Sequence, residues 1–216
     1  MSSIYIHIPF CVSKCNYCNF FSQASLKYKD DFIDALMHEI ELQKEYLIDK
    51  KINTVYFGGG TPSVLQSNEI NIVFAKLSEC FDLSHCEEIT LEANPEHLSR
   101  NYIKSLKDTS VNRISIGVQS FNDDALQYLG RKHRAEQSLI ALENTLKYFS
   151  NVSADLIFGI PVNKGQLQSD VERLIAFDIP HISAYALTVE EKTPLHIKIQ
   201  DGKLQNIDDQ QIADEF

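Results

Sequence analysis

Three cysteines near the start of the chain are the residues whose type and spacing most plainly suggest chemistry. Cys11, Cys15 and Cys18 form a C-x3-C-x2-C pattern just after Pro9. Thiols crowded this closely in one loop seldom form disulfides with one another, because a disulfide requires suitable Cα separations and Cβ directions. We therefore interpret the three thiols as metal ligands.

The number of thiols distinguishes between kinds of metal site. A structural zinc site usually takes four protein ligands, commonly as two pairs, and no second Cys pair follows in the chain. The remaining thiols, Cys80 and Cys86, have no ligand-like spacing. Three thiolates on a cubic [4Fe–4S] cluster would leave the fourth iron open to a small molecule. The pattern favours such a cluster, and a zinc ion held by the three thiols and His7 stays as an alternative.

The bulk composition limits the class of protein. A chain of 216 residues with 44% hydrophobic content can bury one sizeable core, so a single α/β domain is expected. The formal net charge of −10 at pH 7 argues against nucleic acid as a partner and against a general anionic-membrane surface. No signal peptide is recognisable, and no apolar run approaches the ~18 residues of a membrane span. We expect a cytoplasmic protein without a membrane span, and peripheral contact with a membrane stays open.

Short apolar runs of strand length alternate with amphipathic stretches of helix length, which is typical of repeated βα units. Strands are expected at 4–8, 54–57, 88–93, 113–118, 154–158 and 182–187. Helices are expected at 27–49, 67–81, 135–149, 167–177 and 207–216, with two short ones after Ser99 and between Asn122 and Gly130. Both Ser99 and Asn122 are expected to be N-caps, and Gly130 is expected to end its helix. Six such units without a Rossmann glycine fingerprint predict a barrel or partial barrel, whose active site would lie at the strands' carboxyl ends.

Three sequence blocks carry a family resemblance, with the cysteines following the first: Tyr5-Ile6-His7-Ile8-Pro9-Phe10, Gly58-Gly59-Gly60-Thr61-Pro62-Ser63 and Gly117-Val118-Gln119-Ser120-Phe121. Together they resemble the radical S-adenosylmethionine (SAM) enzymes, in the branch of oxygen-independent coproporphyrinogen III oxidase and the HemW-type haem chaperones. The resemblance implies a partial (β/α)6 TIM-like barrel over 1–196. It implies that 197–216 begins a C-terminal region that is otherwise missing, whereas a naturally short protein with a frayed tail is the alternative.

The resemblance also implies roles for individual residues. Cys11, Cys15 and Cys18 would hold a [4Fe–4S] cluster whose open iron binds the amino and carboxylate groups of SAM. The residues that would contact SAM are Tyr5, Gly59, Gly60, Thr61 and Glu92, and those at positions of a second SAM in the oxidase are Gln119, Arg131 and Asp155. The simpler alternatives are an ordinary glycine turn, a solvated charge at Glu92, and a paired carboxylate at Asp155, because a lone buried charge is too costly. The basic run 131–134 would contact SAM or tetrapyrrole carboxylates, or would be a solvated helix end.

Two departures separate the members of this branch. The oxidase has a fourth cysteine where this chain has Phe20, and it has a substantial segment ahead of its cluster motif. Both differences favour a chaperone that binds haem as cargo and delivers it to respiratory apoproteins, with an electron donor for the cluster; whether the chain catalyses a reaction is left open. The alternatives are the oxidase, which converts propionates to vinyl groups to give protoporphyrinogen IX, and a zinc-stabilised interaction domain without catalysis.

Overall fold

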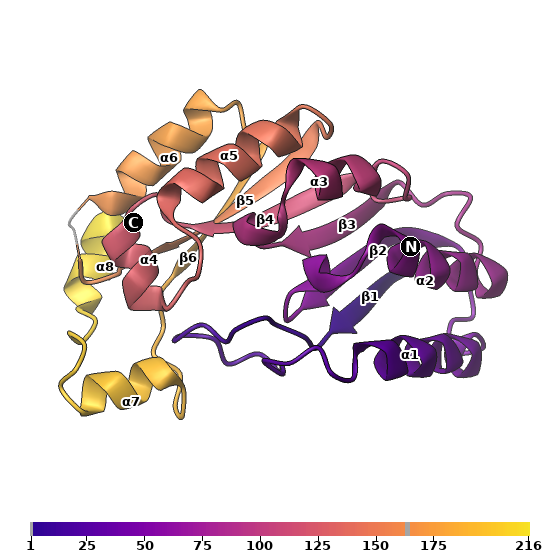
Figure 1. The fold of residues 1–216 in the computed structure, drawn as a ribbon, viewed down its shortest axis with the longest axis horizontal. Helices are drawn as coiled ribbons and strands as arrows, with labels where there is room; N and C mark the ends of the chain where they lie inside the picture. Colours follow the sequence, from indigo (N-terminus) through magenta and orange to yellow (C-terminus); the bar gives the residue numbers. More distant parts are fainter. Residues whose placement is uncertain (1, 163–164) are drawn as a thin grey trace.

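A single sheet of six parallel strands forms the centre of the molecule in a computed structural model that describes residues 2–162 and 165–216 (Figure 1). The strands are hydrogen-bonded in sequence order: β1 (Ser2–Ile8), β2 (Ile52–Gly59), β3 (Glu88–Ala93), β4 (Arg113–Gln119), β5 (Asn151–Phe158) and β6 (His181–Ala186). Because β1 and β6 are the two edges of the sheet, the barrel is open. This confirms the expected α/β fold with a partial barrel.

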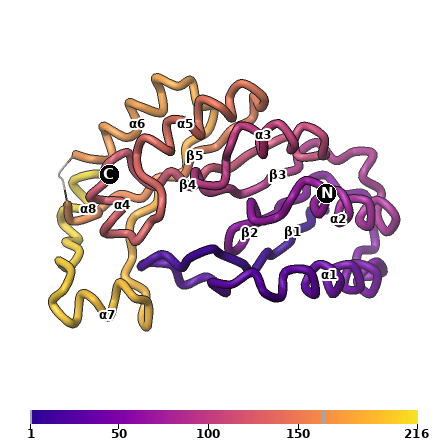
Figure 2. The backbone as a smooth tube through the Cα atoms, viewed as in Figure 1, coloured from indigo at the N-terminus to yellow at the C-terminus, as the bar shows by residue number. Residues whose placement is uncertain are grey.

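Helices connect the strands and cover the outer face of the curved sheet (Figures 1 and 2). The connecting helices are α1 (Lys29–Gln43), α2 (Ser67–Cys80), α3 (Arg100–Leu106), α4 (Asp123–Leu129), α5 (Ala135–Leu146) and α6 (Gln166–Ala176). After β6 come α7 (Pro194–Gln200) and α8 (Asp209–Glu215), and 3-10 turns lie at Pro62–Val64 and Pro95–His97. No helix in the described part of the chain is both long and apolar enough to cross a membrane.

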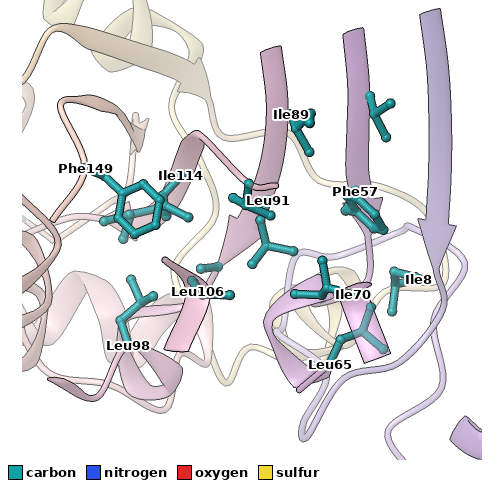
Figure 3. Close-up of a cluster of buried hydrophobic side chains, with 14 of the residues drawn as sticks. Ile8, Phe57, Leu65, Ile70, Ile89, Leu91, Leu98, Leu106, Ile114 and Phe149 are labelled. Atoms are coloured by element: carbon teal, nitrogen blue, oxygen red, sulfur yellow. The ribbon is translucent and has the colours of Figure 1, made fainter. Parts of the chain in front are cut away.

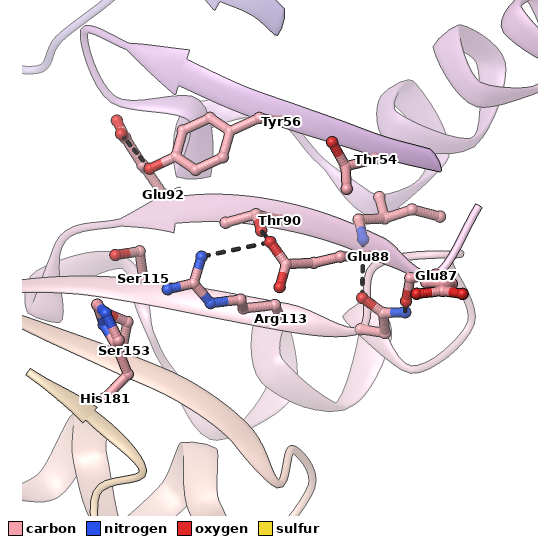
Figure 4. Close-up of polar contacts among 12 residues, drawn as sticks. Thr54, Tyr56, Glu87, Glu88, Thr90, Glu92, Arg113, Ser115, Ser153 and His181 are labelled. Atoms are coloured by element: carbon pink, nitrogen blue, oxygen red, sulfur yellow. Dashed lines mark hydrogen bonds and ion pairs between the residues drawn. The ribbon is translucent and has the colours of Figure 1, made fainter. Parts of the chain in front are cut away.

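The two faces of the sheet differ because successive side chains of a strand point to opposite sides. Ile8, Phe57, Leu91 and Ile114 point outward and are fully buried against the helices, where they form the main core (Figure 3). Their neighbours along the strands are polar and face the inside of the barrel (Figure 4). Parallel sheets are usually apolar on both faces, so a polar inner face indicates a lumen open to water or ligand.

The expected helix ends are confirmed at three positions. The hydroxyl of Ser99 accepts a hydrogen bond from the Tyr102 amide, and the side chain of Asn122 accepts from the amides of Asp124 and Ala125. Gly130 ends α4 with a φ of 73°, in the left-handed region that glycine adopts at little cost. Local capping chemistry therefore fixes these boundaries.

Other expected boundaries are corrected. The first helix was expected over 27–49 with Ile48 facing inward, but α1 ends at Gln43 and Ile48 is fully exposed. β5 begins at Asn151, three residues before the expected start, because its first residues pair with β4. The helix α7 was not expected at all: its seven residues are too few to show helical periodicity.

The segment after β6 packs back onto the barrel. Leu195 of α7 is fully buried beside Tyr128 and Leu129 in a second, smaller hydrophobic cluster. At the end of the chain, the ring of Phe216 stacks on Phe158 with centroids 6.0 Å apart. Residue 196, the expected domain boundary, falls inside α7, and the division there stays a prediction.

Candidate functional site

A cavity of about 670 Å³ lies at the carboxyl ends of the strands, where the cysteine loop covers them. Every predicted site residue except Tyr5 lines it: Cys11, Cys15, Cys18, Gly59, Gly60, Thr61, Glu92, Gln119, Arg131 and Asp155. These residues come from β2, β3, β4, β5 and the loops that follow strands β1, β2 and helix α4. Parallel strands bring their carboxyl ends to one edge, which explains why positions so far apart in sequence meet.

The base of the cysteine loop is closed by hydrogen bonds between its two ends. The Cys11 amide donates to the Gln23 carbonyl over 2.9 Å, and the Gln23 amide donates to the Pro9 carbonyl over 2.8 Å. His7 Nε2 lies 2.9 Å from the Phe21 carbonyl, and its Nδ1 lies 3.1 Å from the Tyr5 hydroxyl. His7 therefore contacts a backbone carbonyl, and both of its ring nitrogens are engaged by protein atoms.

The three thiols line one cavity, and two of them have hydrogen-bond donors beside them. Thr61 Oγ1 lies 3.4 Å from Cys11 Sγ, and Arg131 Nη1 lies 3.4 Å from Cys15 Sγ. Donors placed next to sulfur stabilise the thiolate, which is the form that ligates iron. No group of three or more Cys, His, Asp or Glu side chains in the described residues is arranged around a single metal ion. Three thiolates suit a cluster in which each binds a different iron. The zinc alternative would need His7, whose two ring nitrogens are already engaged by Tyr5 and Phe21.

Arg131 carries positive charge into the cavity wall. Its Nη2 donates to Asn94 Oδ1 over 2.6 Å and to the Gly117 carbonyl over 2.9 Å. Its Nε is buried and has no hydrogen-bond partner among the described atoms. A buried donor left unpaired costs free energy, so an oxygen of a bound ligand would stabilise this arrangement.

The basic run does not form one patch. Arg131 lines the cavity, whereas Lys132 and Arg134 are exposed. His133 is buried between Glu96 Oε2, at 3.2 Å from Nδ1, and the Val118 carbonyl, at 3.1 Å from Nε2. The solvated interpretation holds for Lys132 and Arg134, whereas a carboxylate contact of Arg131 stays a prediction.

The glycine turn is required by packing as well as by any ligand. The Gly60 amide donates to the Ile8 carbonyl over 2.8 Å, and a Cβ at Gly60 would lie 2.7 Å from the Phe10 carbonyl oxygen. Gly59 has a φ of 111°, which only glycine adopts readily. The turn brings bare backbone to the cavity and leaves no room for side chains.

Two carboxylates face the cavity, and each has a hydroxyl partner. Tyr56 donates to Glu92 Oε1 over 2.7 Å, and Ser115 Oγ lies 3.3 and 3.4 Å from the two oxygens of Asp155 (Figure 4 shows Tyr56, Glu92 and Ser115). Burial raises the pKa of Glu92 and of Asp155, and these hydrogen bonds oppose the rise. The expectation that Asp155 is paired is confirmed, and Glu92 is likewise not a solvated charge.

Tyr5 lies next to the site and does not line the cavity. Its ring stacks on Tyr56 with centroids 6.1 Å apart and planes inclined by 24°. Its side chain is 57% exposed, and a Cβ at Gly58 would lie 2.8 Å from its ring. A role of Tyr5 in contacting a ligand stays a prediction.

Gln119 is held in an unusual backbone conformation at the end of β4. Its φ is 66°, in the left-handed region that a glutamine rarely occupies. The two residues that follow are fixed by a buried carboxylate on α6: Ser120 Oγ donates to Asp170 Oδ2 over 2.7 Å, and the Phe121 amide donates to Asp170 Oδ1 over 3.0 Å. Gln166 Nε2 donates to the same carboxylate over 2.7 Å.

Sequence reasoning missed several residues that position this site. Tyr56 holds Glu92, Asn94 accepts from Arg131, and Asp170 fixes the turn after Gln119. Residues at the end of β6, 185–188, also line the cavity. Only the last group had a usable signal, because it follows a predicted strand.

The sequence of the chain matches a known protein family and several known proteins. The family model described as "Radical SAM superfamily" matches residues 5–174. Among characterised relatives, the haem chaperone HemW of Lactococcus lactis is 39% identical over 194 residues, 89% of this chain and 50% of that protein. The haem chaperone HemW of Buchnera aphidicola from Schizaphis graminum is 34% identical over 199 residues, 91% of this chain and 53% of that protein.

A solved structure gives the same result for the fold. The coproporphyrinogen III oxidase HemN of Escherichia coli, described as a radical SAM enzyme, superposes with a TM-score of 0.86 at 26% sequence identity. The match covers 99% of this chain and 50% of that enzyme. The chain thus spans about half the length of the proteins that it matches.

Proposed function

Because the chain belongs to the radical SAM superfamily, we propose that Cys11, Cys15 and Cys18 hold a [4Fe–4S] cluster and that the cavity beside them binds SAM. When bound, such a cluster supplies the electron that opens SAM to methionine and a 5′-deoxyadenosyl radical. The observation that carries the proposal is the convergence of the cysteine loop, the glycine turn and Arg131 on one cavity.

The residues around the cavity suit the groups of SAM. The bare backbone of Gly59 and Gly60 lets the methionine end approach closely, and Thr61 adds a hydroxyl beside Cys11. Glu92 accepts hydrogen bonds from ribose hydroxyls or from an ammonium group, and its hydrogen bond from Tyr56 fixes the carboxylate plane. The unpaired Nε of Arg131 offers a donor for a carboxylate.

We further propose that the whole protein is a haem chaperone that binds haem as cargo and passes it to apoproteins. Two observations support this proposal: the relatives named above are HemW haem chaperones, and Phe20 occupies the position of the oxidase's fourth cysteine. The Phe20 side chain is 68% exposed at the cavity mouth, so it supplies apolar surface where a thiol would otherwise stand. A cytoplasmic location and an electron donor for the cluster belong to the same proposal.

Anaerobic reconstitution with iron and sulfide tests the cluster and SAM proposal. We expect about four irons per chain and an EPR signal of the dithionite-reduced protein that changes when SAM is added. Cys15→Ala should lose the cluster, whereas Cys86→Ala, which removes a thiol outside the cavity, should retain it. A protein that binds no iron under these conditions, or one in which the two variants behave alike, would contradict the proposal.

Oxygen-independent coproporphyrinogen III oxidase is the second candidate function. Gln119, Arg131 and Asp155, which match positions of a second SAM in that enzyme, line the same cavity, and the fold superposes on the Escherichia coli oxidase. The whole protein should be supplied with coproporphyrinogen III and SAM under reducing conditions, and in parallel titrated with haem. Conversion to protoporphyrinogen IX favours the oxidase, whereas stoichiometric haem binding without turnover favours the chaperone.

A further inference from the structure

The middle of the cysteine loop is held by Asn16, to which the proposed function gives no role. Asn16 lies between Cys15 and Tyr17 and is only 9% exposed. Its amide donates to the Leu129 carbonyl over 2.8 Å, and its Nδ2 donates to the Tyr128 carbonyl over 2.7 Å. These are the last two carbonyls of α4, and the last carbonyls of a helix have no partner within it. Asn16 therefore caps the C-terminus of α4.

The same residue also binds α7. The Leu195 amide, in the first turn of α7, donates to the Asn16 carbonyl over 2.8 Å. Lys198 Nζ donates to Asn16 Oδ1 over 2.9 Å. All four hydrogen-bonding groups of Asn16 are thus used, two toward α4 and two toward α7. In Figure 2 the loop, in indigo, runs out from β1 toward the yellow segment that contains α7.

The contact with α4 also determines where Arg131 lies. Gly130 follows α4 directly, and a Cβ there would lie 2.7 Å from Asn16 Cγ, so the loop rests against Gly130 without a gap. Arg131 is the residue after Gly130, and its Nη1 lies 3.4 Å from Cys15 Sγ. Cys15 directly precedes Asn16 in the chain. A short ring of contacts therefore fixes one thiol against one guanidinium.

We infer that Asn16 is a positioning residue that holds Cys15 in register with Arg131 and couples the cysteine loop to α7, from which Lys198 brings a positive charge next to the loop. The inference rests on the proposed function where it concerns the cluster, because the loop is taken to ligate iron. In the metal-free protein, Asn16 acts only on how well ordered the cysteine loop is. In Asn16→Ala the base of the loop stays closed by Cys11 and Gln23 and the two backbone hydrogen bonds of residue 16 remain, but both side-chain hydrogen bonds, to the Tyr128 carbonyl and from Lys198, are lost.

Alkylation of the metal-free, reduced protein tests the inference without any cluster. Iodoacetamide labelling followed by mass spectrometry gives a rate for each thiol, and Cys86, which lies outside the cavity, serves as the internal reference. We expect Asn16→Ala to speed labelling of Cys15 relative to Cys86 by about tenfold at a pH high enough to ionise both thiols, where access to Cys15 and not its thiolate fraction sets the rate. A tenfold change corresponds to about 1.4 kcal/mol of lost local stability. Lys198→Gln should have the same effect in smaller measure.

The control is Lys203→Gln, because Lys203 pairs with Asp201 on the surface and does not contact Asn16. Unchanged labelling of Cys15 in a folded Asn16→Ala protein would overturn the inference. An equal increase at Cys86 would also overturn it, since the effect would then be general unfolding. If Asn16→Ala does not fold, the comparison of Lys198→Gln with Lys203→Gln decides the question.

A second readout uses the reconstituted protein. Lys198→Gln removes a positive charge beside the loop. Because a nearby positive charge favours the reduced cluster, the midpoint potential of the cluster should be lower in this variant than in wild type and in Lys203→Gln. Identical potentials in all three proteins would contradict the electrostatic coupling to α7. A wild-type protein that assembles no cluster would refute the proposed function instead, and the alkylation rates would still judge the role of Asn16.

Discussion

The pair formed by Glu96 and His133 gives the most quantitative test of the structure. Glu96 lies in the turn Pro95–His97, and His133 is only 2% exposed. The two ring nitrogens of His133 face a carboxylate oxygen and the Val118 carbonyl, and both of these accept hydrogen bonds. The ring of His133 therefore supplies a hydrogen bond to the Glu96 carboxylate in a buried setting.

The pKa of Glu96 sets the size of the effect. Burial raises this pKa, but the hydrogen bond from His133 and the positive charge of Arg131 outweigh burial and lower it to about 2. Against an ordinary value near 4.5, the difference corresponds to about 3 kcal/mol of stability. Because the folded-state pKa is lowered, this stability is present above about pH 4.5 and is lost as the pH falls toward 2.

We expect Glu96→Gln, which keeps the shape but not the charge, to lower the free energy of unfolding by about 2 to 3 kcal/mol at pH 7. The gap between variant and wild type should shrink to about half at pH 3. Urea unfolding of the metal-free proteins measures both values. Glu143→Gln is the matched control: it removes an exposed carboxylate paired with Lys147, so its stability should change far less than that of Glu96→Gln at each pH. Equal stability of Glu96→Gln and wild type at pH 7, or a gap that does not change with pH, would refute this reasoning.

Three further predictions concern the positioning of the site. Asp170→Ala leaves three hydrogen-bond donors without their acceptor, at a cost of about 1 kcal/mol each. The Tm should therefore fall by about 6 to 12 °C, and by less in Asp170→Asn. An unchanged Tm would contradict the buried network. Tyr56→Phe removes the hydrogen bond that lowers the pKa of Glu92, so this pKa should rise further. The pH at which SAM affinity reaches half its maximum in the reconstituted protein should then move upward. A midpoint that does not move would contradict this role of Tyr56. Gly60→Ala should lower the Tm more than Gly202→Ala in thermal melts. A Cβ at Gly60 meets backbone atoms at 2.7 Å, whereas nothing lies within 4 Å of one at Gly202, where alanine meets only the strain of a φ of 69°. The reverse order would contradict the packing of the turn.

Features governed by local sequence could be predicted. β3 was expected over 88–93 and lies there, and the caps at Ser99, Asn122 and Gly130 follow from side-chain chemistry within three residues. The end of α1 was misjudged because Ile48 continues the apolar spacing after the helix has ended at Gln43. A hydrophobic residue that continues a helical pattern can equally be exposed, and only tertiary packing decides.

In the candidate site, too, some features follow from the order of the elements and others depend on tertiary packing. The strand ends place Glu92 and the glycine turn at one edge of the sheet, so their convergence could be inferred from order alone. The partners that orient them could not be inferred. Asp170 binds residues 49 and 50 positions earlier in the chain, and Asn16 binds Lys198, 182 positions later. No spacing rule operates across such separations, because they depend on how the barrel brings its loops together.

The open edge of the barrel explains why these long-range contacts carry so much of the site. A closed barrel would join its first and last strands by backbone hydrogen bonds, but here β1 and β6 are both edges. The cysteine loop follows β1, α7 follows β6, and the Leu195 amide joins the two segments through Asn16. A few loop-to-helix hydrogen bonds from Asn16 therefore join the two ends of the sheet, where a closed barrel would have strand pairing. Such contacts can be broken one at a time, so the order of the cysteine loop should respond to substitutions in α7 that leave the sheet and its core intact.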